Sequence, residues 1–426
     1  MKKSILAASV GTVALAGLAW AAAGGMGFGN FGGNGGGTVL LPASNQSASA
    51  ASPVVRATPA SAAEGFQLAA DGKHIVDSYI CKFNAGSVGR GNERAEANRA
   101  ANAAGGRIGH VYDVALQGFS VHASARGVEM MARNNPRIDY CEQDQVMAIV
   151  DPIQALAPPS GGGGGTQPVE QTPLGITKVG GGVIYTGAGR AFVIDTGIDL
   201  NHPDLNVVPQ GNGNDGQSAN FVSRESSADD QNGHGSHVSG TIAGIDNLIG
   251  TVGVAAGARL VAVRVLDRRG SGSNADVIAG VNYVAKFGVV GDVANMSLGG
   301  GVSTALDGAV MAASSKVKFA LAAGNDGGDA NLHSPARVNS PGQIYTIAAY
   351  AATTGAWASF SNFGQPPVDY AEPGVNVFST WKDGGYNTIS GTSMATPHMA
   401  GLLLIGLRDG GTVTRVGGDI YTIGVH

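Results

Sequence analysis

The stretch RAFVIDTGID, residues 190–199, decides the fold class of this sequence. It begins with a near-continuous apolar run, and Asp195 ends that run in front of Thr196 and Gly197. A strand that is buried on both faces of a parallel sheet has this composition. Functional residues of such sheets collect at the carboxyl ends of the strands, so Asp195 is a candidate site residue. The alternative is an Asx turn that only closes the strand.

Apolar runs of strand length alternate with helical segments beyond this stretch. Strands are expected over residues 259–266, 293–298, 317–323 and 344–351, and helices over residues 234–245, 275–286, 305–315 and 396–407. This order predicts an α/β fold with a mainly parallel sheet and helices on both faces. The tail, residues 408–426, is Gly-rich and loses periodicity, which leaves a truncated final helix open.

Composition and charge exclude several classes of protein. Of the 426 residues, 43% are hydrophobic, which is enough for a sizeable core and excludes wholesale disorder. Lys and Arg number 26 against 31 Asp and Glu, giving a net charge of −5 without a block of like charge. Nothing in this pattern suits a phosphate backbone, so we expect no nucleic-acid partner.

The N-terminus has the pattern of an export signal. Lys2 and Lys3 precede a small-residue apolar run over residues 5–23, and Ala19-Trp20-Ala21 offers a cleavage pattern. We predict a signal peptide over residues 1–24 and secretion of the mature protein. An uncleaved membrane anchor is the alternative, since the run could just span a bilayer. No second stretch is long and apolar enough, so no stable membrane association is expected.

Residues 25–150 separate into a spacer and a small folded part. Residues 25–73 are rich in Gly, Ala, Ser and Pro, which predicts a flexible spacer. The pattern over residues 74–150 is strand, helix, strand, strand, helix, strand, which is typical of a ferredoxin-like α+β layout. Its sheet order places Cys81 and Cys141 on neighbouring strands. A disulfide and a pair of buried free thiols both remain open.

Residues 151–170 contain Pro158-Pro159 and five consecutive glycines, so they form a Pro- and Gly-rich linker. The part beyond it, residues 171–426, has no cysteine.

Two further candidates complete a catalytic set. His234 stands in NGHGSHVSGT, residues 232–241, and Ser393 in SGTSMATPHMAG, residues 390–401, where Pro397 suits the first turn of a helix. Alone, a histidine at a helix start is usually a surface residue and a serine there is usually a cap. The order Asp, His, Ser along one chain, however, is that of subtilisin.

With these motifs the sequence resembles the subtilisin-like serine proteases, especially the proteinase K-like branch. The resemblance covers residues 171 to about 407 through VIDTGIDLNHPDL, NGHGSHVSGTIAG, AAGN and SGTSMATPHMAG. It implies a subtilisin-like peptidase domain over residues 171–426, and a serine endopeptidase in which Ser393 is the nucleophile, His234 its base and Asp195 the group that orients the histidine. It assigns the Asn325 side chain and the Ser393 backbone N–H to the oxyanion.

The resemblance also implies where a protein or peptide substrate binds. The substrate lies as a strand between Gly270-Ser271-Gly272 and Ser297-Leu298-Gly299, and Ala322-Ala323-Gly324 line the pocket for the side chain before the cleaved bond. A pocket of Ala and Gly without charge predicts a broad preference for apolar or aromatic side chains.

By the same resemblance, residues 74–150 are an inhibitory propeptide domain that acts as chaperone and inhibitor of its own chain. Its tail, residues 142–150, is expected in the cleft. We predict self-cleavage close to Val150-Asp151 and a second trimming in the linker before Gln171.

Two other functions compete with this interpretation. An inactive binding protein could keep the fold, but it would be free to lose at least one member of the catalytic set. An α/β-hydrolase esterase would need Gly at Ala395 in Gly391-Thr392-Ser393-Met394-Ala395, and its triad has another order.

No cofactor is required for this chemistry. Zinc is disfavoured, because Asp229, Asp230, His234 and His237 form no HExxH motif and His234 has a catalytic role. The resemblance leaves room for structural calcium, since Asp369 aligns with a family calcium ligand. The neighbouring loop, residues 339–343, differs in length from the family pattern. We expect a monomer.

Overall fold

The computed structural model describes residues 68–149, 153–154 and 167–426. The predicted signal peptide, residues 1–24, and most of the predicted spacer and linker therefore lie outside the described residues. All described residues belong to one compact unit of the chain, Ser52–His426.

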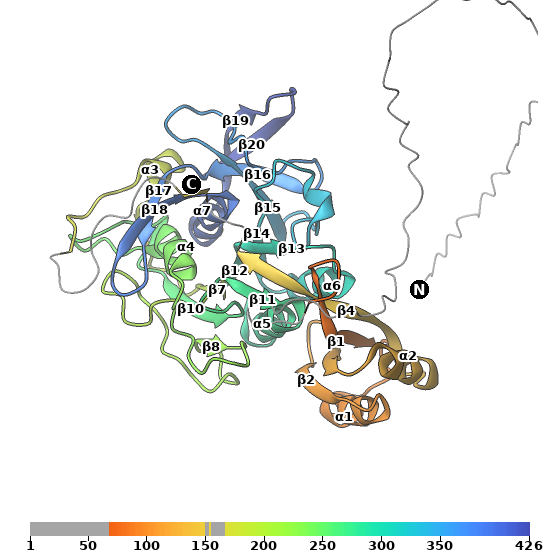
Figure 1. Ribbon diagram of the computed structural model, residues 1–426. Helices are drawn as coiled ribbons and strands as arrows, with labels where there is room; N and C mark the ends of the chain where they lie inside the picture. The colour runs from red at the N-terminus through yellow and green to blue at the C-terminus, as the bar shows by residue number, and fades with distance from the viewer. Residues whose placement is uncertain (1–67, 150–152, 155–166) are drawn as a thin grey trace, which may run out of the picture. The chain divides into compact units, whose positions relative to one another are not determined.

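A mainly parallel sheet organises the C-terminal part, as the sequence predicts (Figure 1). In the described chain it has nine strands, in the spatial order β19 (Arg408–Thr414), β20 (Ile420–Val425), β16 (Val368–Pro373), β15 (Ile344–Tyr350), β14 (Lys318–Ala322), β12 (Val293–Met296), β7 (Arg190–Asp195), β10 (Arg259–Arg264) and β8 (Ala219–Asn220). Every neighbouring pair is parallel except β19 and β20, which are antiparallel.

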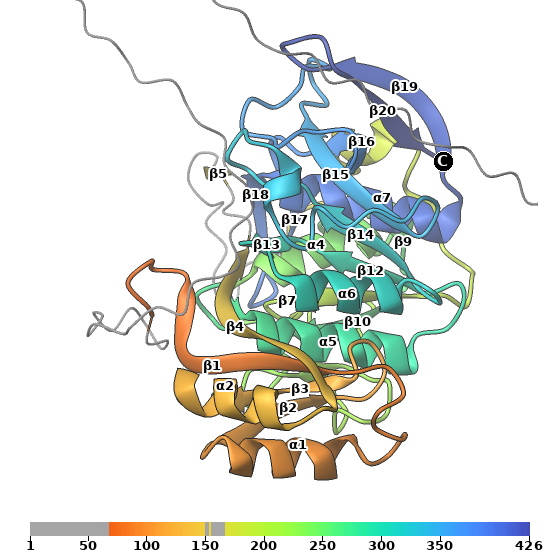
Figure 2. The same ribbon diagram turned by 90° about the vertical axis from the view of Figure 1, so that its right-hand side faces the viewer.

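Alternating side chains of the central strands build a core on each face of this sheet. Phe192 and Ile194 of β7 belong to the same cluster as α5 (Asn274–Phe287) and α6 (Thr304–Ala313). Their neighbours Ala191 and Val193 belong to the cluster of α4 (His234–Ala243) and α7 (Thr392–Ile405). Because side chains of a strand point alternately to opposite faces, a continuous apolar run fills both cores. Figures 1 and 2 show these helices against the sheet.

The N-terminal module, which we define as residues 74–149, has the predicted β-α-β-β-α-β order. Its elements are β1 (His74–Phe83), α1 (Glu93–Ala103), β2 (Arg107–Tyr112), β3 (Gly118–His122), α2 (Ala125–Asn134) and β4 (Ile138–Ile149). The sheet order is β4-β1-β3-β2, so the first and last strands are neighbours. Side chains of α1, α2 and the sheet form a core cluster of their own.

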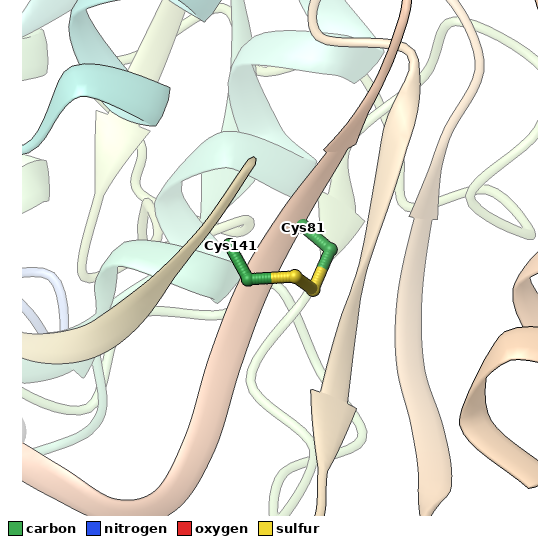
Figure 3. The surroundings of a disulfide bond; sticks show 2 residues. All are labelled: Cys81 and Cys141. Carbon is green, nitrogen blue, oxygen red and sulfur yellow. A yellow bond between two sulfur atoms is a disulfide. The ribbon is translucent and has the colours of Figure 1, made fainter. Parts of the chain in front are cut away.

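A disulfide joins these two neighbouring strands. Cys81 of β1 is directly opposite Cys141 of β4 in the antiparallel register, and their sulfur atoms are bonded (Figure 3). The alternative of two free thiols is therefore wrong for this structure.

Short elements complete the fold. They are β5 (Ile153–Gln154), α3 (Leu174–Lys178), β6 (Val183–Ile184), β9 (Ala255–Ala256), β11 (Ser271–Ser273), β13 (Leu298–Gly300), the 3-10 helix η1 (Ala330–Leu332), β17 (Val377–Thr380) and β18 (Tyr386–Ser390). No helix in the described part of the chain is long and apolar enough to cross a membrane.

One sequence prediction near the C-terminus was wrong, and the open question of the tail is answered. The last helix begins at Thr392, four residues before the predicted start, so Pro397 lies inside it and not in its first turn. The tail loses helical periodicity because it is a hairpin. Its strands β19 and β20 extend the main sheet, and Val413 and Tyr421 are buried.

Candidate active site

Asp195 and His234 form a buried hydrogen-bonded pair. Asp195 is the last residue of β7, and His234 is the first residue of α4. The distance from His234 Nδ1 to Asp195 Oδ1 is 2.8 Å, and both side chains are inaccessible to solvent. A carboxylate can only accept, so Nδ1 carries the proton and Nε2 is left as a base. His234 Nε2 has no hydrogen-bond partner among the described residues.

Asp230 orients the turn that carries this histidine. Its carboxylate accepts the Thr196 hydroxyl at 3.0 Å, the Gly233 amide at 2.9 Å and the Ser236 amide at 2.9 Å. Thr196 follows Asp195, while Gly233 and Ser236 flank His234, so one carboxylate connects both halves of the pair. The sequence analysis considered Asp230 only as a metal ligand. The signal it missed is that of an acidic cap beside a helix N-terminus.

Ser393 is held at the same edge of the sheet as Asp195. Its hydroxyl donates to the Ser297 carbonyl at 3.1 Å, and its carbonyl accepts the Ser297 hydroxyl at 2.9 Å. β12 pairs with β7 in parallel register, with Asn295 opposite Val193, so Ser297 follows β12 at the edge where Asp195 ends β7.

Pro397 explains why the Ser393 carbonyl is available for this contact. In a helix the carbonyl of residue 393 would accept the amide of residue 397, but proline has no N–H. The Ser297 hydroxyl supplies the missing donor.

The Asn325 side chain has a fixed orientation beside the nucleophile. Its Oδ1 accepts the Thr392 amide at 2.8 Å and the Thr392 hydroxyl at 2.9 Å. Because Oδ1 is occupied by two donors, the amide group of Asn325 presents Nδ2 on its other side. A Cβ added to Gly391 would lie 3.0 Å from this Nδ2, so the group lies close to the start of α7.

The two segments predicted to flank a substrate hold a segment of the chain itself. β4 pairs antiparallel with β11 on one side and with β13 on the other (Figure 1). Ala148 lies opposite both Ser271 and Gly299, and the Ile149 amide donates to the Gly270 carbonyl at 2.9 Å. Residues 146–149 are thus a strand inserted between two edges.

A further segment of the chain, β5, pairs with the strand that precedes α7. In β5, Ile153 lies opposite Ser390 of β18, three residues before Ser393. The predicted cleavage site Val150-Asp151 lies outside the described residues.

The predicted pocket residues lie at the end of β14. Ala322 and Ala323 are buried, and Gly324 has a φ of +111°, a conformation that favours glycine. The Gly324 amide donates to the Thr392 hydroxyl at 3.2 Å, which connects this segment to Asn325 and the start of α7. None of the three residues is charged.

His237, one of the residues considered for zinc, is hydrogen bonded to the backbone. His237 donates from Nε2 to the Val377 carbonyl at 3.0 Å, and burial lowers its pKa to about 3, so it is neutral. No group of three or more His, Cys, Asp or Glu residues that could hold a metal ion occurs in residues 68–149, 153–154 and 167–426.

Two carboxyl groups, the half-buried Asp369 and the buried Asp204, are candidate calcium ligands. Asp369 accepts the Thr346 amide at 2.9 Å, and burial raises its pKa to about 6. Asp204, which the sequence analysis did not consider, accepts the Thr251 amide at 2.9 Å through Oδ2, while its Oδ1 has no hydrogen-bond partner among the described residues. Burial raises the pKa of Asp204 to about 7.

Comparison with known proteins identifies the family. The profile of the Subtilase family matches residues 192–408, which contain all members of the catalytic set. The chain belongs to this family. It is a serine-type endopeptidase of the subtilisin-like group.

Relatives support this membership over most of the chain. The "Extracellular serine proteinase" of Thermus sp. (strain Rt41A) is 41% identical over 321 residues, 74% of this chain and 72% of that protein. The "Alkaline serine exoprotease A" of Vibrio alginolyticus is 40% identical over 310 residues, 72% of this chain, and the match spans 55% of that protein's length. The "Cuticle-degrading protease" of Metarhizium anisopliae is 36% identical over 77% of this chain and 79% of that protein.

A solved structure shows the same fold. A cold-adapted subtilisin-like serine proteinase matches with a TM-score of 0.51 and 38% identity, covering 59% of this chain and 96% of that protein.

Proposed function

We propose that the protein is a secreted serine endopeptidase of broad, apolar-preferring specificity that is made as a self-processing zymogen. One observation carries the proposal. Residues 146–149 are paired as a strand between β11 and β13, and Ser297, the residue before β13, contacts Ser393. This is how a peptide substrate is held by its main chain.

The catalytic steps follow from the geometry of the site. His234 Nε2 takes the proton of Ser393 Oγ, which attacks the peptide carbonyl, and the same proton is then given to the leaving amine. Asp195 holds the tautomer and stabilises the imidazolium. Asn325 Nδ2 and the Ser393 N–H donate to the oxyanion, and such a donor is worth about 3 to 4 kcal/mol in the transition state. Water then hydrolyses the acyl-enzyme.

The N-terminal module is proposed as an inhibitor and folding aid because β4 supplies caps to two helices of the catalytic part. Glu142 accepts the Ser303 hydroxyl and the Ala305 amide at the start of α6. Asp144 accepts the Ala275 amide at 3.2 Å at the start of α5. Carboxylates at helix N-termini satisfy free amides and complement the helix dipole. Both helices are therefore stabilised when the module is docked.

The proposed cleavage site follows from the strand register. Leu298 lies opposite Ile149, the last residue of β4, and Ser297, which precedes Leu298, contacts Ser393. This register supports cleavage at Val150-Asp151, with a second trimming in the linker before Gln171. The neutral segment Ala322-Ala323-Gly324 supports the apolar preference.

Secretion and a monomeric state complete the proposal. The N-terminal signal pattern supports export, and the name of the Thermus relative describes an extracellular enzyme. The active site described here is built from one chain.

Structural calcium is proposed with Asp369 as one candidate ligand and Asp204 as a second. Asp204 is fully buried with a free Oδ1, and Glu170 approaches the same loop, accepting the Leu248 amide at 2.9 Å. Calcium binds carboxylate oxygens, and Asp204 Oδ1 is one without a hydrogen-bond partner among the described residues. Bound calcium would hold the Asp204 carboxyl in its charged form. It has no part in the chemistry.

The test compares the wild type with Ser393→Ala, both produced at full length and without added protease. Intact mass and N-terminal sequencing should show a wild-type chain that begins near residue 151 or later and digests casein. The Ser393→Ala chain should keep the N-terminal module. A wild type that keeps the module and leaves casein intact would overturn the zymogen mechanism, and the inactive binding protein would then be pursued.

A further inference from the structure

Asn362 is hydrogen bonded to the backbone on both sides of Asn325. Its own amide donates to the Gly324 carbonyl at 3.0 Å, one residue before Asn325. Its side-chain Oδ1 accepts the Asp326 amide at 3.1 Å, one residue after Asn325, and the Gly328 amide at 2.9 Å. Asn362 is fully buried, and it lies in the loop between β15 and β16, far from Asn325 in the sequence.

Gly324 makes room for this contact. A Cβ added to Gly324 would lie 2.2 Å from Nδ2 of Asn362, and Gly324 has a positive φ of +111°. A side chain at residue 324 would therefore displace Asn362 from the turn. The contact therefore depends both on glycine at residue 324 and on the side-chain amide of Asn362.

Two separate restraints thus act on Asn325. Thr392 fixes the rotation of its side chain through Oδ1. Asn362 fixes the backbone from which that side chain projects. An oxyanion donor is effective only when it is already placed where charge develops, so a shift of its backbone weakens the donor without removing it.

We propose that Asn362 is a positioning residue for the oxyanion donor Asn325. The inference rests on the proposed function, in which Asn325 Nδ2 donates to the oxyanion. Asn362 itself touches neither the substrate nor the reacting atoms. Its effect is on the transition state and passes through Asn325.

The test is a double-mutant cycle on the mature enzyme with a neutral peptide substrate. Asn362→Ala should lower kcat about 10-fold or more with less than about a 2-fold change in KM, because the donor acts after the substrate has bound. In the Asn325→Ala background the same substitution should change kcat less than about 2-fold. Asn331→Ala is the matched control, since its side chain donates to Asp329 and Pro366 and should leave kcat unchanged.

Different results would overturn the positioning role of Asn362 and the oxyanion assignment of Asn325. Equal loss of kcat in both backgrounds, or a rise in KM with kcat unchanged, would overturn the positioning role. An Asn325→Ala enzyme with normal kcat would instead overturn the oxyanion assignment in the proposed function. If Asn362→Ala does not accumulate, Asn362→Ser is measured in its place, because serine is too short to accept both amides. Thermal unfolding in the Ser393→Ala background checks that each variant is folded.

Discussion

The disulfide of the N-terminal module should set how long the proposed inhibitor stays bound. It joins β1 to β4, and β4 also carries Glu142, Asp144 and the segment inserted between β11 and β13. Loss of the bond that ties β4 to β1 should therefore weaken the contacts that β4 makes with the catalytic part. The perturbation is the double substitution Cys81→Ala and Cys141→Ala.

The size of the effect follows from the length of chain that the bond closes. The two cysteines are 60 residues apart in sequence, and closing a loop of that length stabilises the folded state by about 4 kcal/mol in the chain-entropy model. A small domain has a total stability of roughly 5 to 15 kcal/mol. Loss of the bond should thus remove a large share of the module's free energy of unfolding, because the closed loop contains nearly all of the module.

The assay uses the full-length Ser393→Ala precursor, which cannot process itself, with and without the double substitution. Hydrogen exchange of the β1 and β4 amides should become faster by two to three orders of magnitude, as expected for about 4 kcal/mol of lost protection. In the active background, proteolytic activity should appear earlier when the cysteines are replaced.

A thiol reductant provides the matched control. Each reduction consumes one dithiol and converts the disulfide into two thiols, and the chain has only these 2 cysteines. The reductant should speed exchange in the precursor with the disulfide and leave the double variant unchanged. Exchange rates in β1 and β4 that stay within a factor of about five in both comparisons would refute the reasoning, since the bond would then contribute little.

Four further substitutions or treatments test the site and the fold. Asp195→Asn should lower kcat about 10⁴-fold because the histidine tautomer is lost, as steady-state kinetics on a peptide substrate will check. Asn325→Ala should lower kcat about 10²- to 10³-fold with little change in KM, measured in the same assay. Burial raises the pKa of Glu372 well above its ordinary 4.5, and its only hydrogen bond among the described residues is from the Gly424 amide. Because the folded state holds this proton more tightly than the unfolded state, Glu372 lowers the free energy of unfolding by an amount that grows as pH rises above about 4.5. The difference in unfolding temperature between Glu372→Gln and the parent should accordingly increase in favour of the variant from pH 4.5 to pH 8. An equal difference at both pH values would contradict the titration. A chelator should lower the unfolding temperature of the parent but not of Asp204→Asn, and equal sensitivity of the two would argue against calcium at that carboxyl.

The main sheet could be predicted because the apolar composition of each strand indicates burial on both faces. Residues 191–194 are all apolar, so both faces of this strand are apolar, and the structure buries both faces. The sequence indicates no regular element for the tail, because β19 is rich in Gly and polar residues, although β20 is mostly apolar. Their pairing with each other and with β16 comes from backbone hydrogen bonds, which leave little trace in the side chains. The start of α7 was misplaced because Pro397 was assigned to the first turn, and the donor that replaces its missing N–H comes from Ser297.

The residues of the site likewise divide into those that sequence motifs indicate and those that they do not. Asp195, His234 and Ser393 could be found from their motifs and order, and the structure brings Asp195 and His234 into direct contact. Asp230 and Asn362 could not be found in that way. Asp230 accepts nearby amides, but the contact that connects it to Asp195 is with the hydroxyl of the distant Thr196. Asn362 accepts the distant amides of Asp326 and Gly328, and a sequence gives no direction for an amide.

Cleavage of the chain and release of the inhibitor should therefore be separate events. The segment of residues 146–149 is held by main-chain pairing on both sides, and none of those hydrogen bonds involves the proposed scissile bond at residues 150 and 151. Cutting that bond leaves the pairing and the caps supplied by Glu142 and Asp144 unchanged. Full activity then requires the module to unfold or to be digested. The lifetime of the inhibited state should accordingly follow the stability of the N-terminal module, and with it the Cys81–Cys141 bond, while the rate of the first cut follows the geometry around Ser393.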